Sequence, residues 1–398
     1  MKTWKRNLFF LWIGTFITAS SFSMVIPFLP IFLLQIGVHQ HVAVWSGSLY
    51  SASYLAGAIS APFWGNMADR YGRKPMIIRA GFVLVFVYTM TAFVTTPVEL
   101  LILRIIQGLL SGYIPGAIAL VATNTPEDQV GYALSMISAA SATGTIFGPL
   151  IGGIIAHLSS NRIAFATAGI LVLISTILVI FWVKEDPFLK SDHRSSMLDT
   201  FKQALNNRPL TAALILNMFT SLSIMTIEPV ITLYITQLIH SITDASLIAG
   251  IVFSLSGIAS AVFAPLWGRA ADRYGFTTIL VIGLFGGSLW TFMQLPFQNI
   301  WWFASIRFLY GAFFSAVFPA INGLVFQSTN PSFRGRAFGL NQTANQLGSM
   351  LGPVLGGTVT EATSIHGLFW VTGTFLTSVA VISTWRLRSS IGLTKSKV

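Results

Sequence analysis

Two charged side chains lie inside long apolar runs of this sequence, and they are the residues best placed to do chemistry. Charged residues make up only 9% of the 398 residues. Glu228 lies in TIEPVITLY, where a carboxyl group can load and release a proton or attract a cation. A permanently protonated Glu228 that only donates a hydrogen bond is the structural alternative.

Arg104 is the second of these side chains. It lies in LILRIIQG, and an arginine inside a membrane-spanning helix costs about 3 kcal/mol unless it faces protein or water. A functional role is therefore the first hypothesis, and a structural cation bonded to backbone carbonyls is the second. Arg307 lies in a matching run, SIRFLYG, but we place it near the entrance of the opposite face and rank it below Arg104.

The elements that position these residues are apolar runs long enough to span a membrane. A spanning helix needs about 20 apolar residues, and 54% of this chain is hydrophobic. We therefore predict an all-α membrane protein with twelve transmembrane helices. The predicted spans are 8–34, 44–66, 76–95, 99–122, 131–156, 163–183, 209–238, 245–268, 276–295, 301–326, 336–360 and 367–386.

Basic residues gather in the loops that these spans place on one side of the membrane. The central loop 184–208 and the C-terminal tail are rich in Lys and Arg, whereas Arg162 is the basic residue of the other side. This bias places both termini in the cytoplasm. The first apolar run continues to Leu34, which is too long for a secretory signal, so we expect it to be retained.

Composition excludes several classes of function. The formal net charge is +11, but its distribution reports membrane orientation rather than nucleic-acid binding. The dipeptide Gly-Lys is absent from the chain, and with it a P-loop for ATP. Cysteine is absent too, and the sequence shows no metal cluster and no nucleophile–base pair. We therefore expect neither an enzyme nor a cofactor, with the proton as coupling ion.

The sequence repeats itself in two halves. Three motifs recur in the same order, the first two at an offset of 203 residues and the third at 204. They are APFWGNMADRYG (61–72) with APLWGRAADRYG (264–275), Arg104 with Arg307, and GTIFGPLIGG (144–153) with GSMLGPVLGG (348–357).

Parallel repeats of this kind predict two six-helix bundles related by a pseudo-two-fold axis, with a substrate site between them at the midplane. We place the first bundle at 1–183, the cytoplasmic central loop at 184–208, and the second bundle with the tail at 209–398.

The motifs resemble those of the major facilitator superfamily, in particular its twelve-helix drug:proton antiporters, over essentially the whole chain. GNMADRYGRK resembles the signature between helices 2 and 3, LILRIIQG that of helix 4, and GTIFGPLIGG the antiporter motif of helix 5. MVIPFLPIF resembles the paired prolines of helix 1. The resemblance implies the major facilitator fold and alternating access.

The resemblance also implies that the charged loop latches the cytoplasmic gate. We expect Asp69 to bind the cytoplasmic end of another helix, where the helix dipole favours a carboxylate, with Arg336 as a partner. The second copy lacks two of the cations, so we expect the first latch to matter more; a topological anchor without gating is the alternative. The predicted latch residues are Gly65, Asp69, Arg70, Gly72, Arg73, Lys74, Arg336, Asp272 and Arg273.

Individual residues of this loop carry further expectations. Gly65 should permit close approach of helices, and Gly72 should adopt a positive φ in a short turn. Arg73 and Lys74 should lie among anionic headgroups.

The helix 5 motif predicts a close helix contact. Gly144, Gly148 and Gly152 share one helix face, which lets a neighbouring helix approach, and Pro149 bends the helix. The resemblance implies a seal at the contact between the two halves, and a generic tight interface is the alternative. The predicted motif residues are Gly144, Gly148, Pro149, Gly152 and Gly153.

For proton coupling, the resemblance gives Arg104 a part in proton transfer with a nearby carboxylate. Relatives often carry an acid in helix 1, where this chain has serines at 20, 21 and 23. We therefore predict coupling through Glu228, Arg104 and Asp69, with Asp69 and Glu361 as the titratable alternatives near the membrane faces.

A loosely selective pocket for lipophilic molecules is the expected substrate site. Few fixed charges and many adaptable apolar side chains, among them 32 Phe and 11 Met, favour promiscuous binding. The candidate lining residues are Gln107, Tyr113, Asn217, Glu228, Tyr234, Asn322, Asn341 and Asn345.

The function that the resemblance implies is proton-coupled export of lipophilic, often cationic drugs, with antibiotic resistance of a bacterium as its consequence. A specific sugar or metabolite exporter is the alternative, and an uptake symporter or a membrane receptor is less favoured. We expect a multi-pass protein of the cell membrane that contacts lipids, works as a monomer, and uses neither ATP nor nucleic acid.

Overall fold

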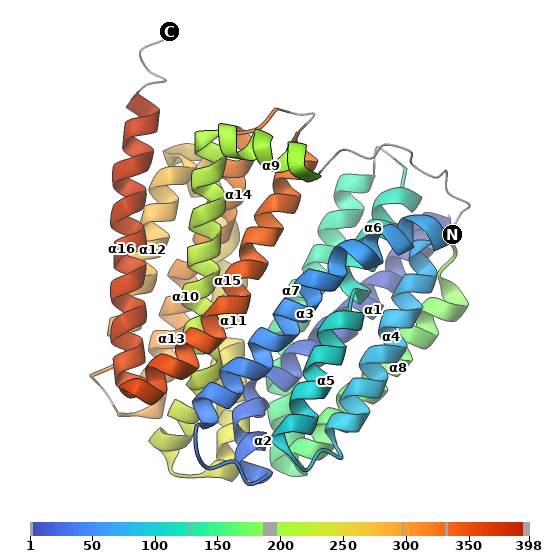
Figure 1. Cartoon of the computed structure of the whole chain (residues 1–398), viewed down its shortest axis with the longest axis vertical. Helices are drawn as coiled ribbons and strands as arrows, with labels where there is room; N and C mark the ends of the chain where they lie inside the picture. The colour runs from blue at the N-terminus through green and yellow to red at the C-terminus, as the bar shows by residue number, and fades with distance from the viewer. Residues whose placement is uncertain (1–2, 127–128, 186–196, 297, 331–332, 393–398) are drawn as a thin grey trace. The chain divides into compact units, whose positions relative to one another are not determined.

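The computed structural model describes residues 3–126, 129–185, 197–296, 298–330 and 333–392. Within these ranges the regular secondary structure is helical and contains no strand (Figure 1). The chain divides into two compact units: Met1–Asp192 with Ile231–Ser254, and His193–Val230 with Leu255–Val398. The bundle boundaries at 183 and 209 stay a prediction.

The first unit contains the helices of the first half of the chain. They are α1 (Thr3–Val25), the short 3-10 helix η1 (Ile26–Phe28), α2 (Leu29–Gln35), α3 (Val42–Tyr71), α4 (Arg73–Thr91), α5 (Pro97–Leu110), α6 (Tyr113–Asn124), α7 (Val130–Leu158) and α8 (Asn161–Trp182). α1 packs along α7 and α8, α4 packs on α8, and α3 packs on α5 (Figure 1).

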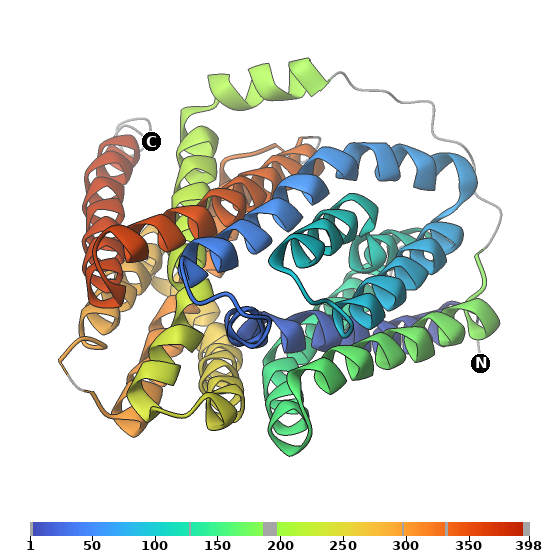
Figure 2. The same ribbon diagram turned by 60° about the horizontal axis from the view of Figure 1, so that its bottom comes forward.

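The second unit contains most of the remaining helices. They are α9 (Met197–Asn206), α10 (Arg208–Ile239), α11 (Ile242–Tyr274), α12 (Phe276–Phe292), α13 (Ile300–Phe314), α14 (Val317–Gln327), α15 (Arg334–Ala362) and α16 (Ile365–Gly392). The second half of α10 and the first half of α11 belong to the first unit. α12 packs on α13, α14 and α16, and the short α9 runs across the end of α10 (Figure 2).

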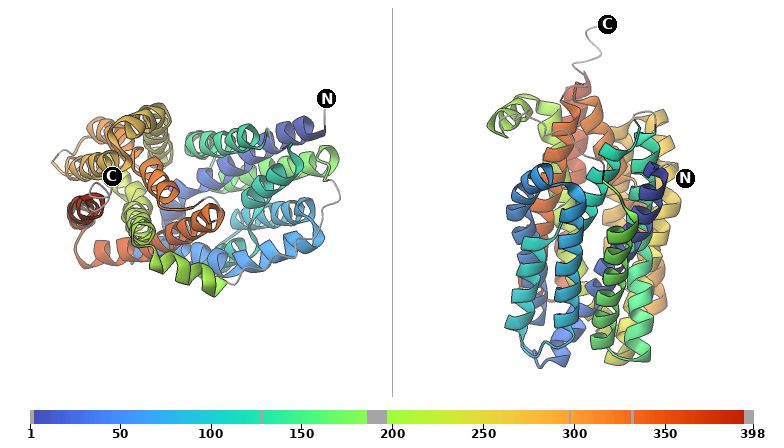
Figure 3. Two further views of the ribbon diagram at one scale, coloured as in Figure 1. Left: turned by 90° about the horizontal axis from the view of Figure 1, so that it is seen from above. Right: turned by 90° about the vertical axis from the view of Figure 1, so that its right-hand side faces the viewer.

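Each predicted span falls on a helix or on a broken helix of the described residues. Among these residues, nine helical stretches are long and apolar enough to cross a membrane, and α12 is a shorter apolar helix. α3 and α15 fall below that hydropathy because they are rich in Ser, Gly and amide side chains. Within each unit the axes of the long helices are roughly aligned, so the helices are foreshortened when seen from above (Figure 3).

Glycines explain the closest helix contacts in both units. On α7, a Cβ at Gly144 would meet Ala19 of α1, and one at Gly152 would meet Phe28. On α15, a Cβ at Gly352 would meet Met225 of α10. The two copies of the glycine-rich motif therefore make the same contact, each with the first long helix of its own half.

Candidate functional site

Glu228 and Arg307 lie together in the second unit. Glu228, on α10 directly before Pro229, is partly buried, and Arg307, on α13, is only 7% exposed. The two charges interact electrostatically, and the Arg307 guanidinium lies 4.8 Å over the ring of Tyr310. Arg307 is thus buried near an acid. From the sequence alone we expect it near the entrance of the opposite face and rank it below Arg104.

Arg104 occupies the matching place in the first unit with different neighbours. It is 5% exposed, and its Nη1 donates a 2.6 Å hydrogen bond to Gln107 Oε1. Gln107 Nε2 in turn donates to the Tyr88 hydroxyl at 3.3 Å. Arg104 Nε and Nη2 have no hydrogen-bond partner among the described residues. These two buried donors are unsatisfied within the part of the chain that the structure describes.

The repeat shows why the two arginines differ. Gly152 lies against the Met24 oxygen and Gly356 against the Thr226 oxygen, so the offset between α1 and α10 is 202 and Ile26 lies opposite Glu228. On α5 and α13 the offset of 203 places Gln107 opposite Tyr310. Ile26 is apolar, so an acid accompanies the arginine in the second unit but not at this position of the first. An arginine with an acid has a net charge that one proton can change, whereas Arg104 and Gln107 keep theirs.

Asparagines predicted to line a pocket instead bond to one another. Asn217 Nδ2 on α10 donates to Asn341 Oδ1 on α15 at 2.8 Å, and Asn341 Nδ2 donates to Asn322 Oδ1 on α14 at 2.9 Å. Asn345 Nδ2 donates to Ser221 Oγ at 2.7 Å. These contacts join α10, α14 and α15. The asparagine side chains therefore form many of their hydrogen bonds within the protein. Their role as substrate ligands stays a prediction.

Two tyrosines predicted to line the pocket are buried as well. Tyr113 is 2% exposed, and its hydroxyl lies 2.5 Å from Ser175 Oγ, which donates to the carbonyl oxygen of Gly14 at 3.1 Å. Tyr113 therefore joins α6 to α8 and α1. Tyr234, on the part of α10 that belongs to the first unit, is 1% exposed.

The loop between α3 and α4 is held by an acid that reasoning from the sequence missed. Gly72 has a φ of +100°, as its place in the turn predicts. Glu185, just after α8, accepts hydrogen bonds from the backbone N–H groups of Arg73 at 2.7 Å and Lys74 at 2.9 Å. A carboxylate at this position satisfies free N–H groups at the N-terminus of α4 and interacts favourably with the helix dipole.

The cations of this loop bind protein. Arg73 Nη1 donates to Thr123 Oγ1 at 2.9 Å, and Lys74 Nζ donates to the carbonyl oxygen of Ile180 at 2.9 Å. The expectation that both lie among headgroups is therefore incorrect for this structure. Their side chains have partners on α6 and α8 because the turn at Gly72 folds α4 back toward these helices.

Other latch residues are less constrained. The side chain of Asp69 lies outside the described residues, so its partnership with Arg336 stays a prediction. No described atom lies within 4 Å of a Cβ placed at Gly65, so this glycine makes no close helix contact here, against expectation. In the second copy, Arg273 lies over the ring of Tyr274, as Arg70 lies over the ring of Tyr71 in the first.

The helix 5 motif has a second contact face, turned toward the start of α11. A Cβ at Gly153 would lie 2.9 Å from the carbonyl oxygen of Ser246, and one at Gly250 would clash with the carbonyl of Pro149. Ser254 Oγ donates to the carbonyl oxygen of Ile146 at 2.6 Å. The backbone of α7 thus contacts the backbone of α11 directly. The other glycines of the motif face α1.

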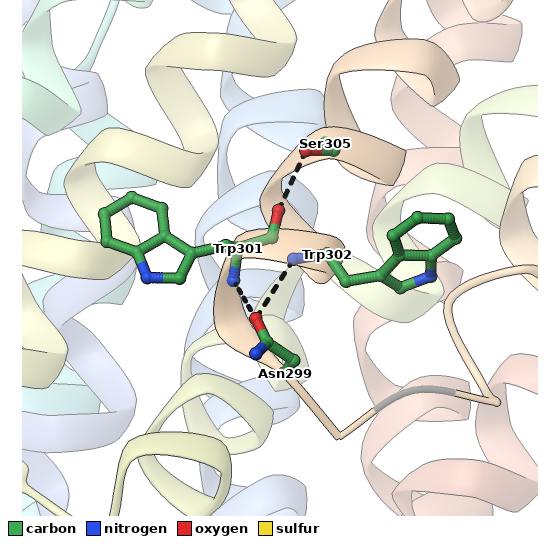
Figure 4. Close-up of a pocket in the computed structure, with 4 residues that line it drawn as sticks. All are labelled: Asn299, Trp301, Trp302 and Ser305. Carbon is green, nitrogen blue, oxygen red and sulfur yellow. Dashed lines mark hydrogen bonds between the residues drawn. The ribbon is translucent and has the colours of Figure 1, made fainter.

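An open hollow lies at the start of α13. It is lined by Asn299, Trp301, Trp302 and Ser305 (Figure 4). Asn299 Oδ1 accepts from the backbone N–H groups of Trp301 at 2.9 Å and Trp302 at 3.3 Å, and the two indoles point in opposite directions. The hollow is a helix cap flanked by exposed tryptophans and offers no charged group.

Comparison with known proteins decides the family. The model of the Major Facilitator Superfamily matches residues 11–248 and again residues 213–396, two overlapping matches that together span most of the chain. The chain belongs to the major facilitator superfamily. Membership makes the chain a multi-pass membrane transporter and not an enzyme, and it confirms the predicted family and fold class.

Curated relatives within the superfamily cover nearly the whole chain. Over 378 residues it is 34% identical to "Multidrug resistance protein MdtG" of Proteus mirabilis, covering 93% of each protein. Over 393 residues it is 33% identical to the protein of the same name in Yersinia enterocolitica, covering 97% of this chain and 94% of that one.

Solved structures of superfamily transporters share the fold. The nucleoside transporter NupG matches with a TM-score of 0.79 at 16% identity, over 95% of this chain and 98% of its own. A bacterial homolog of the human lysosomal transporter Spinster matches with a TM-score of 0.83 at 12% identity, over 98% of this chain and 97% of its own.

Proposed function

We propose that this transporter exports small lipophilic compounds, often cationic drugs, in exchange for protons. The names of its relatives support drug export, and the observation that supports proton coupling is the electrostatic interaction of Glu228 with the buried Arg307. Charged side chains at membrane depth are costly unless paired, and such pairs commonly mark proton pathways.

Exchange follows from the charge of this pair. When Glu228 is ionised it neutralises Arg307; when it is protonated, Arg307 carries an uncompensated charge. The protonated and ionised forms of Glu228 are therefore stabilised by different environments around the two residues. Binding of a proton can thus shift the equilibrium between two conformations of the transporter. A cationic substrate near ionised Glu228 competes with the proton, so that export of one requires entry of the other.

The cellular setting of the proposal follows from charge distribution. We place the protein in the bacterial cell membrane with both termini in the cytoplasm, since the basic loops favour that side. It works as a monomer among membrane lipids, with the proton gradient and not ATP as its energy source.

The test is transport by purified protein in proteoliposomes with an imposed pH gradient and a panel of cationic, neutral and anionic compounds. Glu228→Gln removes the ionisable group at nearly constant shape. We expect it to abolish uphill export driven by the pH gradient while exchange of substrate for substrate continues, because exchange needs no net proton movement. Export by Glu228→Gln at the rate of the unaltered protein would exclude Glu228 as the proton carrier.

A matched control is Glu361→Gln, at the exposed C-terminal end of α15. It removes one carboxylate outside the Glu228–Arg307 pair and should leave uphill export unchanged. The panel also tests the specific exporter: transport of a single polar metabolite, with no lipophilic compound accepted, would favour that alternative.

A further inference from the structure

Helix 4 of the first half is broken, although its sequence predicts one continuous span over 99–122. α5 ends at Leu110 and α6 begins at Tyr113 (both labelled in Figure 1), and Gly112 between them has a φ of +128°. That backbone conformation is one that glycine adopts without strain. Pro115, which follows, has no N–H to offer the carbonyl of Ser111.

The break removes the helical donors of three successive carbonyls, and side chains of two other helices replace them. Trp64 Nε1 on α3 donates to the Leu109 oxygen at 2.6 Å. Arg79 Nη2 on α4 donates to the oxygens of Leu110 at 3.2 Å and Ser111 at 2.9 Å. Backbone groups at membrane depth must be satisfied, and here one arginine and one tryptophan do so.

These two side chains also bind each other. The guanidinium carbon of Arg79 lies 3.3 Å from the centroid of the Trp64 ring, which is a close cation–π contact. Arg79 and Trp64 therefore form one unit that we call the carbonyl clamp. It joins α3 and α4 to the C-terminal end of α5, directly before the break in helix 4.

The second half has the tryptophan of the clamp but not the arginine. Trp267 Nε1 donates to the oxygen of Ala312 at 2.7 Å, as Trp64 does at its own position. The residue at the position of Arg79 is Ile282. Ser315, where the helix changes direction, keeps a helical φ of −60°.

A difference of one residue explains this contrast. Two residues separate Gly108 from Ser111, whereas three separate Gly311 from Ser315, and here the repeat changes its offset from 203 to 204. With the extra residue the second copy keeps an α-helical bond from the Ser315 N–H to the Gly311 oxygen at 3.0 Å, whereas the Ser111 N–H of the first copy reaches only the Gly108 oxygen, at 3.5 Å. The first copy is shorter, breaks at Gly112, and needs the arginine.

We propose that Arg79 is a positioning residue of the transport machinery. Through the carbonyl clamp it holds helix 4 broken and so sets the orientation of Arg104 and Gln107 on α5 relative to Tyr113 on α6. Arg104 lies less than two turns before the break, and its two unpartnered donors depend on that orientation. This inference rests on the proposed function only where transport is its readout.

A distance across the break tests the clamp without any transport. The chain has no cysteine, so Ile102→Cys on α5 and Ile118→Cys on α6, which are 52% and 39% exposed, supply one pair of spin labels. We expect one narrow distance distribution in the otherwise unaltered protein. Arg79→Gln and Trp64→Phe should each shift or broaden it, and Trp267→Phe, the matched change in the second half, should not.

Transport supplies the second readout. Arg79→Gln should lower kcat by about tenfold or more with a smaller effect on KM, because misplacement of a working group by about 1 Å has such effects. Arg79→Lys keeps the charge but loses the planar stacking on Trp64. Its kcat should therefore be little higher than that of Arg79→Gln. The effects of Arg79→Gln and Trp64→Phe should not add in the double variant, since each breaks the same unit.

The outcomes separate this inference from the proposed function. An unchanged label distance in Arg79→Gln, or full restoration by Arg79→Lys, would overturn the clamp as a positioning device. A shifted distance in a protein whose transport proves independent of pH would leave the clamp intact and contradict proton coupling alone.

Discussion

Glu185 Oε1 accepts a 2.7 Å hydrogen bond from the backbone N–H of Arg73, a residue 112 positions earlier in the chain. The carboxylate lies just after α8, far along the chain, and binds the backbone at the loop between α3 and α4. Asn7 on α1 joins the same region, because its Oδ1 accepts from the Lys184 N–H at 3.0 Å. The loop between α3 and α4 is thus a junction of five helices, because Arg73 also reaches Thr123 on α6.

Glu185→Gln should destabilise this junction. The variant keeps one acceptor but loses the negative charge at the N-terminus of α4, which is worth about 1 kcal/mol. We expect the midpoint of thermal unfolding in detergent to fall by roughly 2 °C. Asp272→Asn, at an exposed carboxylate of α11, serves as control, and an equal fall in both variants would deny Glu185 a special role.

Gln107→Leu should impair Arg104 more than it impairs the fold. The change removes the acceptor of the 2.6 Å bond from Arg104 Nη1, and a hydrogen bond to a charged group contributes about 1.5–3 kcal/mol. We expect export to fall by about tenfold or more. Gln107→Glu keeps an acceptor and adds a charge, so it should retain the position of Arg104 but alter the pH profile of export. If both variants export normally, the contact has no part in transport.

Gly250→Ala should loosen the contact between α7 and α11. The new methyl group has no room against the carbonyl of Pro149, and overpacking of this kind costs about 1–3 kcal/mol. If the contact also seals the transporter, proteoliposomes should leak protons. The control is Gly339→Ala on α15, where no described atom lies within 4 Å of the added carbon. That change should stabilise its helix by up to about 1 kcal/mol.

Asp69→Asn should slow transport more than Asp272→Asn does. The two aspartates hold equivalent places in the repeat, but the first is followed by Arg73 and Lys74 with their contacts to α6 and α8. Phe276 occupies the position of Arg73 in the second copy and packs against Gly323 instead. Initial rates of export from matched amounts of protein decide the matter. Equal rates in the two variants would contradict an asymmetric latch.

Much of the fold could be predicted because local sequence and the membrane leave few choices. Apolar runs of spanning length must be helices when backbone groups have no water to bind. The positive φ of Gly72 and the close contacts of Gly144 follow from residue type and spacing, since glycine alone offers both. The repeat carried the same predictions to the second half, where Gly275 has a φ of +88°.

The site was predicted only in part, because its partners are distant in sequence. Nothing near Glu228 indicates that Arg307 will lie beside it, and Glu185 looks like one more charge of a basic loop. The Asn217–Asn341 bond likewise joins residues 124 positions apart. A side chain's type states which bonds it can form, but packing of helices decides which groups are within reach.

The sequence by itself determined the family, the helical spans and the position of Glu228 and Arg104 inside apolar helices, since these depend on composition, periodicity and repeated motifs. Only the tertiary structure decided which charges are paired, which asparagines bond to one another, and where helix 4 breaks. The physical reason is that a buried polar group is stabilised by whichever partner lies within about 3 Å, and that distance is set by the packing of whole helices.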